Sequence, residues 1–271
     1  MTEQRAPRYG TIDYDYGATL ATTDPADDGP VWMVNLMRYR ETADYADGRE
    51  SSISGREADD RYAPLGPLAA VGAAPVFVAD VETQLLGEPG WDRVAVVKYP
   101  TRRSFIEMQQ RPDFQELHHH KEAGMQQTIV MGTLPMDAPE GPDVDWATVP
   151  HPPTDDDGPV CVVHVIRFEN AEAAHEIPED MRAYQQAATN VALQHGARID
   201  GWFAVEGTIL GDGRAWHQVR FNSFPSREAF MAVVSDPDRL EAQKEHREAA
   251  IADTYALITR PTINELRSSR Q

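Results

Sequence analysis

The chain contains an internal repeat, and this repeat constrains its fold more than any other feature. The segment GPVWMVNLMRY begins at Gly29, and the similar segment GPVCVVHVIRF begins at Gly158. Later in each copy, YPTRRSF matches FPSREAF at a spacing of 125 residues, at positions 99–105 and 224–230. Matching over roughly 100 residues is typical of a duplicated structural unit. The chain is therefore expected to contain two copies of one arrangement.

Each copy predicts the order strand, helix, strand, strand, helix, strand. The runs VWMVNLM and VCVVHVI are apolar and rich in β-branched residues, which favours strands. PVFVADVETQLL and VAVVKY flank the turn GEPG as in a β-hairpin, and the second copy has GDGR in the same place. Thr101 and Ser226 stand before helical segments as expected N-caps. This order is that of the ferredoxin-like βαββαβ unit, whose bare sheet face must pack on another sheet. We expect an α+β fold of two tandem ferredoxin-like repeats packed sheet to sheet.

The segments around the repeat predict the domain boundaries. The first 28 residues are polar and rich in Asp and Thr, so we expect a loosely packed arm. The stretch between the copies is rich in Pro, Asp and Gly, which suits an extended linker. Trp146 and Val149 are expected to hold this linker in a surface groove. The expected arm, first domain, linker, second domain and tail are residues 1–28, 29–136, 137–157, 158–264 and 265–271.

Composition excludes several classes of partner and site. The chain has 25 Lys and Arg against 44 Asp and Glu, a net charge of −19. Such a chain repels nucleic acids and anionic membranes, so we expect neither as a partner. Cys161 is the one cysteine, which excludes an intramolecular disulfide and favours a reducing compartment. With no apolar leader or membrane-spanning run, the expected location is the cytoplasm.

Several catalytic motifs are missing from the sequence. It contains no GxxxxGK[ST] phosphate loop, HExxH zinc helix or GxSxG nucleophile turn. No flavin, nicotinamide or metal motif is present either, so we expect no cofactor. Three consecutive histidines, His118 to His120, cannot converge on one ion, because successive helical side chains point about 100° apart. We therefore expect no metal site.

At this level of detail the chain resembles the dimeric α+β barrel superfamily. The resemblance is carried by NLMRYR with HKEAGMQQT in the first copy and by HVIRF with HREAAIADT in the second. The resemblance covers residues 29–136 and 158–262. Within the superfamily, the chain is similar to an uncharacterised branch near the cofactor-free monooxygenases of aromatic polyketides. The superfamily also includes haem-degrading enzymes, lactone isomerases, chlorite dismutases and stress proteins. The resemblance implies a barrel of two sheets. It leaves open whether one chain closes this barrel as a pseudo-dimer or two chains pair.

Alternation along the first strand of each copy predicts candidate site residues. Asn35 and His164 occupy matching mid-strand positions, and His164 departs from the Asn of the family pattern. Alternate residues of a strand share a face, and we expect both side chains to face the barrel interior. The alternative for His164 is a structural hydrogen bond to a neighbouring strand.

The third strand differs between the copies. Arg220 and Asn222 stand where the first copy has Ala95 and Val97. We expect Arg220 and Asn222 to point away from the helices, so that only the second copy has a polar cavity wall. The alternative is an exposed sheet face.

Other candidates could bind a flat substrate. Trp202 and Glu206 share a strand face. Trp216 has a matching Trp in the first copy, and it is either part of an aromatic rim for the substrate or an architectural residue. Tyr184 offers a phenol as a hydrogen-bond donor. His120 and His246 are also retained by the repeat, 126 residues apart.

The leading functional hypothesis is a cofactor-independent oxygenase that acts on an anthrone, anthraquinone or phenol in aromatic polyketide biosynthesis. Its partners would be this aromatic substrate and dioxygen. We expect His164 to act as base, since an ordinary histidine titrates near pH 6.5. Arg220 and Asn222 would stabilise the oxyanion. The alternatives are a non-oxidative cyclase or isomerase, a small-molecule-binding or stress protein, and a haem enzyme with His120 or His246 as ligand.

Overall fold

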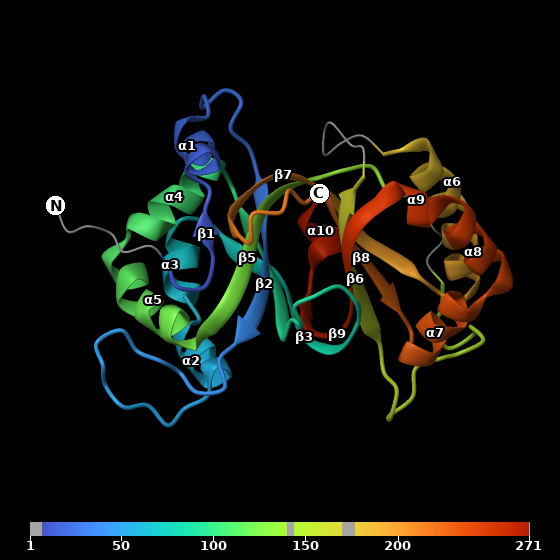
Figure 1. Cartoon of the computed structure of the whole chain (residues 1–271), viewed down its shortest axis with the longest axis horizontal. Coiled ribbons are helices and arrows are strands. Elements are labelled where there is room, and N and C mark those ends of the chain that lie inside the picture. Colours follow the sequence, from blue (N-terminus) through green and yellow to red (C-terminus); the bar gives the residue numbers. More distant parts are fainter. Residues whose placement is uncertain (1–6, 140–143, 170–176, 271) are drawn as a thin grey trace. The chain divides into compact units, whose positions relative to one another are not determined.

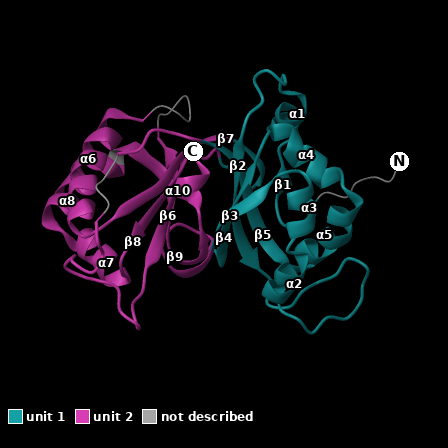
Figure 2. Cartoon of the chain, turned by 180° about the vertical axis from the view of Figure 1, so that it is seen from behind, with its two compact units in different colours: residues 1–78, 91–134, 207–214 teal, residues 79–90, 135–206, 215–271 magenta. Residues whose placement is uncertain are grey.

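The computed structural model describes residues 7–139, 144–169 and 177–270, and it divides into two compact units (Figures 1 and 2). Unit 1 comprises residues 1–78, 91–134 and 207–214, and unit 2 comprises residues 79–90, 135–206 and 215–271. Each unit takes segments from both halves of the sequence, because strands β3 (Ala74–Leu86) and β7 (Arg198–Gly211) each run from one unit into the other.

Unit 1 is a sheet with helices packed against it. Strand β2 (Val31–Tyr39) lies between β4 (Arg93–Tyr99) and β5 (Met125–Pro135) in antiparallel pairing, with Asn35 opposite Ala95 and Val130. The remaining elements are β1 (Thr11–Ile12), α1 (Tyr14–Thr22), α2 (Gly55–Tyr62), α3 (Leu65–Ala70), the start of β3 (Ala74–Leu86), α4 (Arg102–Gln110) and α5 (Pro112–Gly124).

Unit 2 has the same plan. Strand β6 (Val160–Phe168) lies antiparallel between β8 (Gln218–Phe224) and β9 (Ile251–Asn264), and β8 also pairs with β7 (Arg198–Gly211). The helical elements are α6 (Glu179–Gln194), α7 (Arg227–Ser235), α8 (Pro237–Ala242), the π-helical η1 (Gln243–Arg247), α9 (Glu248–Ala250) and α10 (Leu266–Ser269).

The strand pairings agree with the predicted α+β class. From β2 to β5, and again from β6 to β9, the chain runs strand, helical segment, strand, strand, helical segment, strand, and β1 and α1 precede the first of these runs. The hydrogen-bonded order is β1-β7-β5-β2-β4-β3-β9-β6-β8, with a further β7–β8 pairing. Within the described residues, the pairings therefore form a closed cycle of eight strands. No helix in the described ranges is long and apolar enough to cross a membrane.

The N-terminal segment differs from the expected loosely packed arm. From residue 7 onward it contains β1 and α1, and Asp13 caps α1 by accepting a hydrogen bond from the Tyr16 N–H at 2.9 Å. Tyr16 and Leu20, four residues apart on one helix face, are buried in the core of unit 1. A Cβ at Gly207 would overlap the Tyr16 ring, so this glycine allows the close packing. The polar composition concealed this short apolar face; residues 1–6 lie outside the described part.

The segment between the two copies is held as predicted. The Trp146 indole donates to the Gly196 carbonyl at 2.7 Å, and the Arg198 guanidinium lies 4.1 Å from the centre of the Trp146 ring. Val149 is buried against Gly196, whose positive φ of 79° favours glycine at this helix end. Residues 140–143 of the expected linker lie outside the described residues.

Candidate active-site pocket in unit 2

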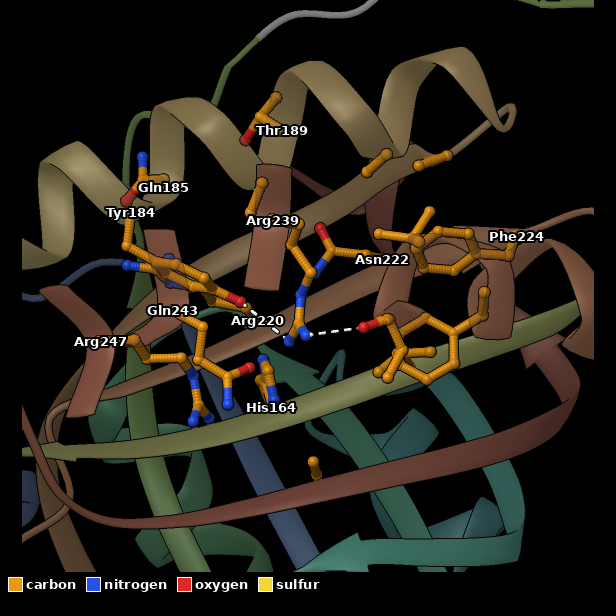
Figure 3. Close-up of a pocket in the computed structure, with 18 of the residues that line it drawn as sticks. His164, Tyr184, Gln185, Thr189, Arg220, Asn222, Phe224, Arg239, Gln243 and Arg247 are labelled. Atoms are coloured by element: carbon orange, nitrogen blue, oxygen red, sulfur yellow. Dashed lines mark hydrogen bonds between the residues drawn. The ribbon is translucent and has the colours of Figure 1, made fainter. Parts of the chain in front are cut away.

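A pocket of about 360 Å³ lies within unit 2, between its sheet and its helices (Figure 3). This volume falls in the range of roughly 300–1,000 Å³ that is usual for small-molecule sites. Most of the wall is apolar and includes residues of β6, α6, β8 and α7, among them Val162, Ala188, Leu193, Phe224, Phe230 and Val233. His164, Arg220 and Asn222 lie together in this wall, as does Tyr184 from α6.

The face on which His164 lies corrects the sequence prediction. Its same-face neighbours Val160 and Val162 pack with Val191 of α6 and Val233 of α7. His164 therefore faces the helices of its own unit, not the opposite face of the sheet as we expected. The opposite face carries Cys161, Val163 and Val165, which are fully buried.

Asn35 is likewise on the helix-facing side in unit 1. Met33 and Met37 on its face pack with Phe105 and Phe114 of the covering helices. The Asn35 amide donates to the Met33 carbonyl at 3.0 Å. The expectation that Asn35 faces away from the helices is thus wrong as well, and Asn35 lies outside the pocket of unit 2.

Arg220 and Asn222 also point to the helix side, contrary to prediction. They line the pocket, while Val219 and Phe221 are fully buried on the opposite face, where Phe221 contacts Phe203 at a ring separation of 5.9 Å. The prediction rests on the expectation that the apolar residues of this strand, Val219 and Phe221, face the helices. In unit 2 the small residues of α6 leave space above the sheet, and polar side chains fill part of it.

Arg220 belongs to a fixed polar wall. Its Nε and Nη2 atoms donate to the Gln218 side-chain oxygen at 3.1 and 2.6 Å, and its guanidinium lies 4.2 Å from the Trp202 ring centre. The Trp202 indole donates in turn to the Asn222 Oδ1 atom at 3.1 Å. Register explains this grouping, because Arg220 stands directly opposite His164 on one side and Trp202 on the other. Burial lowers the pKa of Arg220 to about 9, which still leaves it charged at neutral pH.

Two further arginines line the pocket, and sequence reasoning missed both. Arg239 of α8 donates to the Tyr184 hydroxyl and to the Val234 carbonyl, each at 3.1 Å. Arg247, at the end of η1, is 7% exposed, and its Nε atom has no hydrogen-bond partner in the described structure. A signal for Arg247 was present, since the repeated HKEA and HREA segments place a cation at Lys121 and Arg247, and both are buried.

The pocket changes the chemistry expected of His164. Burial, followed by the charges of Arg247, Arg220 and Arg239, lowers the pKa of His164 to about 3. The expectation of a base with an ordinary pKa near 6.5 is therefore wrong. At neutral pH the imidazole is neutral, with one ring nitrogen able to accept a proton or hydrogen bond.

Four other predicted residues lie outside this pocket. Trp216 is buried against Tyr255, with ring centres 5.0 Å apart, and Glu206 is not part of the lining. His120 lies in unit 1 with its Nδ1 atom 2.7 Å from the Tyr45 hydroxyl, and His246 contacts the Asp180 carboxylate at 3.1 Å. Across the described ranges, no three His, Cys, Asp or Glu side chains form a group that could hold a metal ion.

Comparison with known proteins gives no family assignment. No protein-family model and no curated protein matches the chain. Among solved structures, the methylated RPA0582 protein is 31% identical over 48% of this chain and 98% of its own, with a TM-score of 0.42. A chlorite dismutase from Candidatus Nitrospira defluvii is 13% identical over 94% of this chain and 99% of its own, with a TM-score of 0.48. An anthrone oxidase-like protein is 14% identical over 89% and 96%, with a TM-score of 0.45. These TM-scores are all below 0.5, so the likenesses define neither the fold nor the function of this chain.

Proposed function

We propose that this chain is a cofactor-independent oxygenase that acts on a flat polycyclic phenol or anthrone. The observation that carries the proposal is the pocket of unit 2, where an apolar enclosure holds one polar wall of Trp202, Arg220 and Asn222 beside His164. The apolar walls would bury the rings, and the oxygen atom of the substrate would lie against the polar wall.

The polar wall favours the anionic form of such a substrate. Arg220 carries a positive charge in a place where water is largely excluded, so its attraction for a phenolate or enolate oxygen is strong. Trp202 fixes the Asn222 amide by donating to its oxygen, which leaves the Nδ2 group to donate to the substrate oxygen. Both contacts lower the pKa of the bound phenol or carbon acid.

His164 can take the proton that the substrate loses. Its imidazole is neutral at physiological pH, which is the form that accepts a proton. A substrate anion would offset the charges of the arginines that lower the pKa of His164. The imidazolium that forms is therefore stabilised by the substrate anion.

The substrate itself supplies the electrons for the reaction. An anthrone carbanion, formed when His164 removes a proton from the CH₂ group, reduces dioxygen and combines with it to give a carbon-bound hydroperoxide after proton return. Loss of water converts this hydroperoxide to a ketone. Two C–H bonds break, one C=O bond forms, and one oxygen atom of dioxygen leaves as water. The protein binds and orients the anion and excludes water.

Oxygen uptake with a panel of anthrones and hydroxyanthraquinones tests the proposal. We expect uptake coupled to product, unaffected by chelators. Arg220→Gln and His164→Gln should each lower kcat/KM by about 100-fold, as loss of one oxyanion donor or base commonly does. Arg182→Gln, on the exposed face of α6, is the matched control and should retain full turnover. Tight binding without uptake would exclude the oxygenase, and full activity of both variants would exclude these roles.

A further inference from the structure

The proposed chemistry leaves a second group of cations in the same pocket unused. Arg239 and Arg247 enter it from α8 and η1, and Gln243 lies on the same η1 turn (Figure 3). Arg239 donates to the Tyr184 hydroxyl oxygen, so the Tyr184 O–H itself remains able to donate to a ligand. The Arg247 Nε–H is buried without a partner in the described structure. Several donors thus meet here, opposite an apolar wall.

Their positive charge has no internal counterpart among the residues that the structure describes. Arg220, Arg239 and Arg247 form no ion pair with a carboxylate there; their hydrogen bonds go to the Gln218 amide, the Val234 carbonyl and the Tyr184 phenol. Burial lowers the pKa of Arg247, and repulsion by Arg239 lowers it further. Glu248 attracts Arg247 but is itself exposed. Arg220 and Arg247 are buried, whereas Arg239 is half-buried. A buried cation with no carboxylate beside it destabilises a fold, and an anionic ligand would remove that cost.

The mouth of the pocket is apolar, which restricts the chemical class of anion that can bind there. Four of the six large hydrophobic side chains that are exposed in the described structure line this pocket: Leu85, Leu86, Met231 and Leu240. Apolar surface gathered at a cavity indicates a ligand with a large apolar body. The aromatic side chains in the lining, Tyr184, Trp202, Phe224 and Phe230, favour a flat ring system over an alkyl chain.

We propose that the natural ligand is a polycyclic aromatic carboxylic acid whose carboxylate is bound by Arg239 and Arg247, the arginines that enter the pocket from α8 and η1. Guanidinium groups match the planar geometry of a carboxylate and bind it with charge-assisted hydrogen bonds. The proposal rests on the proposed function in one respect, since it names the substrate class of the same pocket.

The subsite can be tested without turnover by measuring the binding of two compounds that resemble a reaction product and cannot be oxidised further. The probes are anthraquinone-2-carboxylate and its neutral carboxamide, which share one ring system, with affinity followed by Trp fluorescence and calorimetry. We expect the carboxylate to bind at least about tenfold more tightly. Arg239→Gln and Arg247→Gln should remove this preference, whereas Arg247→Lys should retain part of it because the charge remains. Arg182→Gln is the control and should keep the preference whole.

Three results would overturn the inference. Equal binding of carboxylate and carboxamide by the unaltered protein would exclude an anion subsite. A preference that survives in both glutamine variants would place the anion elsewhere. Tighter binding of dodecanoate than of the anthraquinone acid would replace the aromatic ligand by an alkyl one. Failure of the oxygenase proposal is distinguishable, because the carboxylate preference would then remain in a protein that takes up no oxygen.

Discussion

His164 shares its pocket with three guanidinium groups, and burial together with these charges lowers the pKa of His164 to about 3. The value in an unfolded chain is near 6.5. Between these two values the unfolded chain binds more protons than the folded protein. The free energy of unfolding therefore falls as the pH drops from about 6.5 towards 3. The stability that depends on a neutral His164 is fully present only above pH 6.5.

We expect NMR titration of the imidazole nitrogens to find His164 neutral from pH 8 down to about pH 4. Arg247→Gln should raise its pKa towards 6.5, because one repelling charge is removed. In urea unfolding, His164→Asn should make stability less dependent on pH between 6.5 and 4. Ordinary titration of His164 near pH 6.5 in the unaltered protein would contradict the buried, cation-flanked site.

At the scale of elements, both units anchor a helix in the same way. The N-caps Thr101 and Ser226, predicted from the sequence, each accept a first-turn N–H hydrogen bond at 3.0 Å. A carboxylate adds to each cap: Asp28 accepts from two N–H groups of α4, and Asp157 accepts from two of α7. Carboxylates at helix N-termini are stabilising because the first N–H groups have no partner within the helix. Of these two helices, α7 lines the pocket and α4 does not.

Ser226→Ala and Thr101→Ala remove the N-cap of α7, which lines the pocket, and of α4, which does not, so they form a matched pair of variants. Each should lower the free energy of unfolding by about 1 kcal/mol, as measured by urea titration. Ser226→Ala should also weaken binding of the anthraquinone acid, because α7 carries Phe230 and Val233 into the pocket. Thr101→Ala should leave binding unchanged. An equal effect of the two changes on affinity would show that α7 does not shape the site.

At the scale of the whole molecule, an acidic chain contains a cationic pocket. The net charge of −19 repels an anion at long range, whereas Arg239 and Arg247 attract it at contact. The two effects differ in range. Added salt screens the long-range repulsion most strongly, since the Debye length falls from about 30 Å at 0.01 M to about 8 Å at 0.15 M.

The association rate of anthraquinone-2-carboxylate should therefore rise with salt over this range, as measured by stopped-flow fluorescence. The carboxamide, which has no charge, should associate at a rate that salt leaves unchanged. A carboxylate rate that falls with salt would mean that the pocket arginines, not the net charge, dominate the field that the approaching ligand meets.

The sequence by itself determined the features that depend on neighbours along the chain. The repeat fixed the element order of both halves, the N-caps located the starts of α4 and α7, and Trp146 predicted a linker held to a surface. Alternation correctly grouped His164 with Val162, and Arg220 with Asn222. These features follow from backbone geometry and local hydrogen bonds, which a pattern of residues expresses directly.

Tertiary structure alone decided which sheet face the helices cover. Both faces of β6 are apolar, with Val162 on one and Val163 on the other, so a period of two cannot assign them. Tertiary packing also places Arg239 and Arg247 in the pocket: the repeat marks a cation at Arg247, but no local pattern shows that the segments after α7 return these side chains to the sheet. The pKa of His164 depends on these distant charges and on burial. Packing between elements far apart in the chain sets all three, because electrostatic and apolar contacts depend on distance in space and not on distance along the sequence.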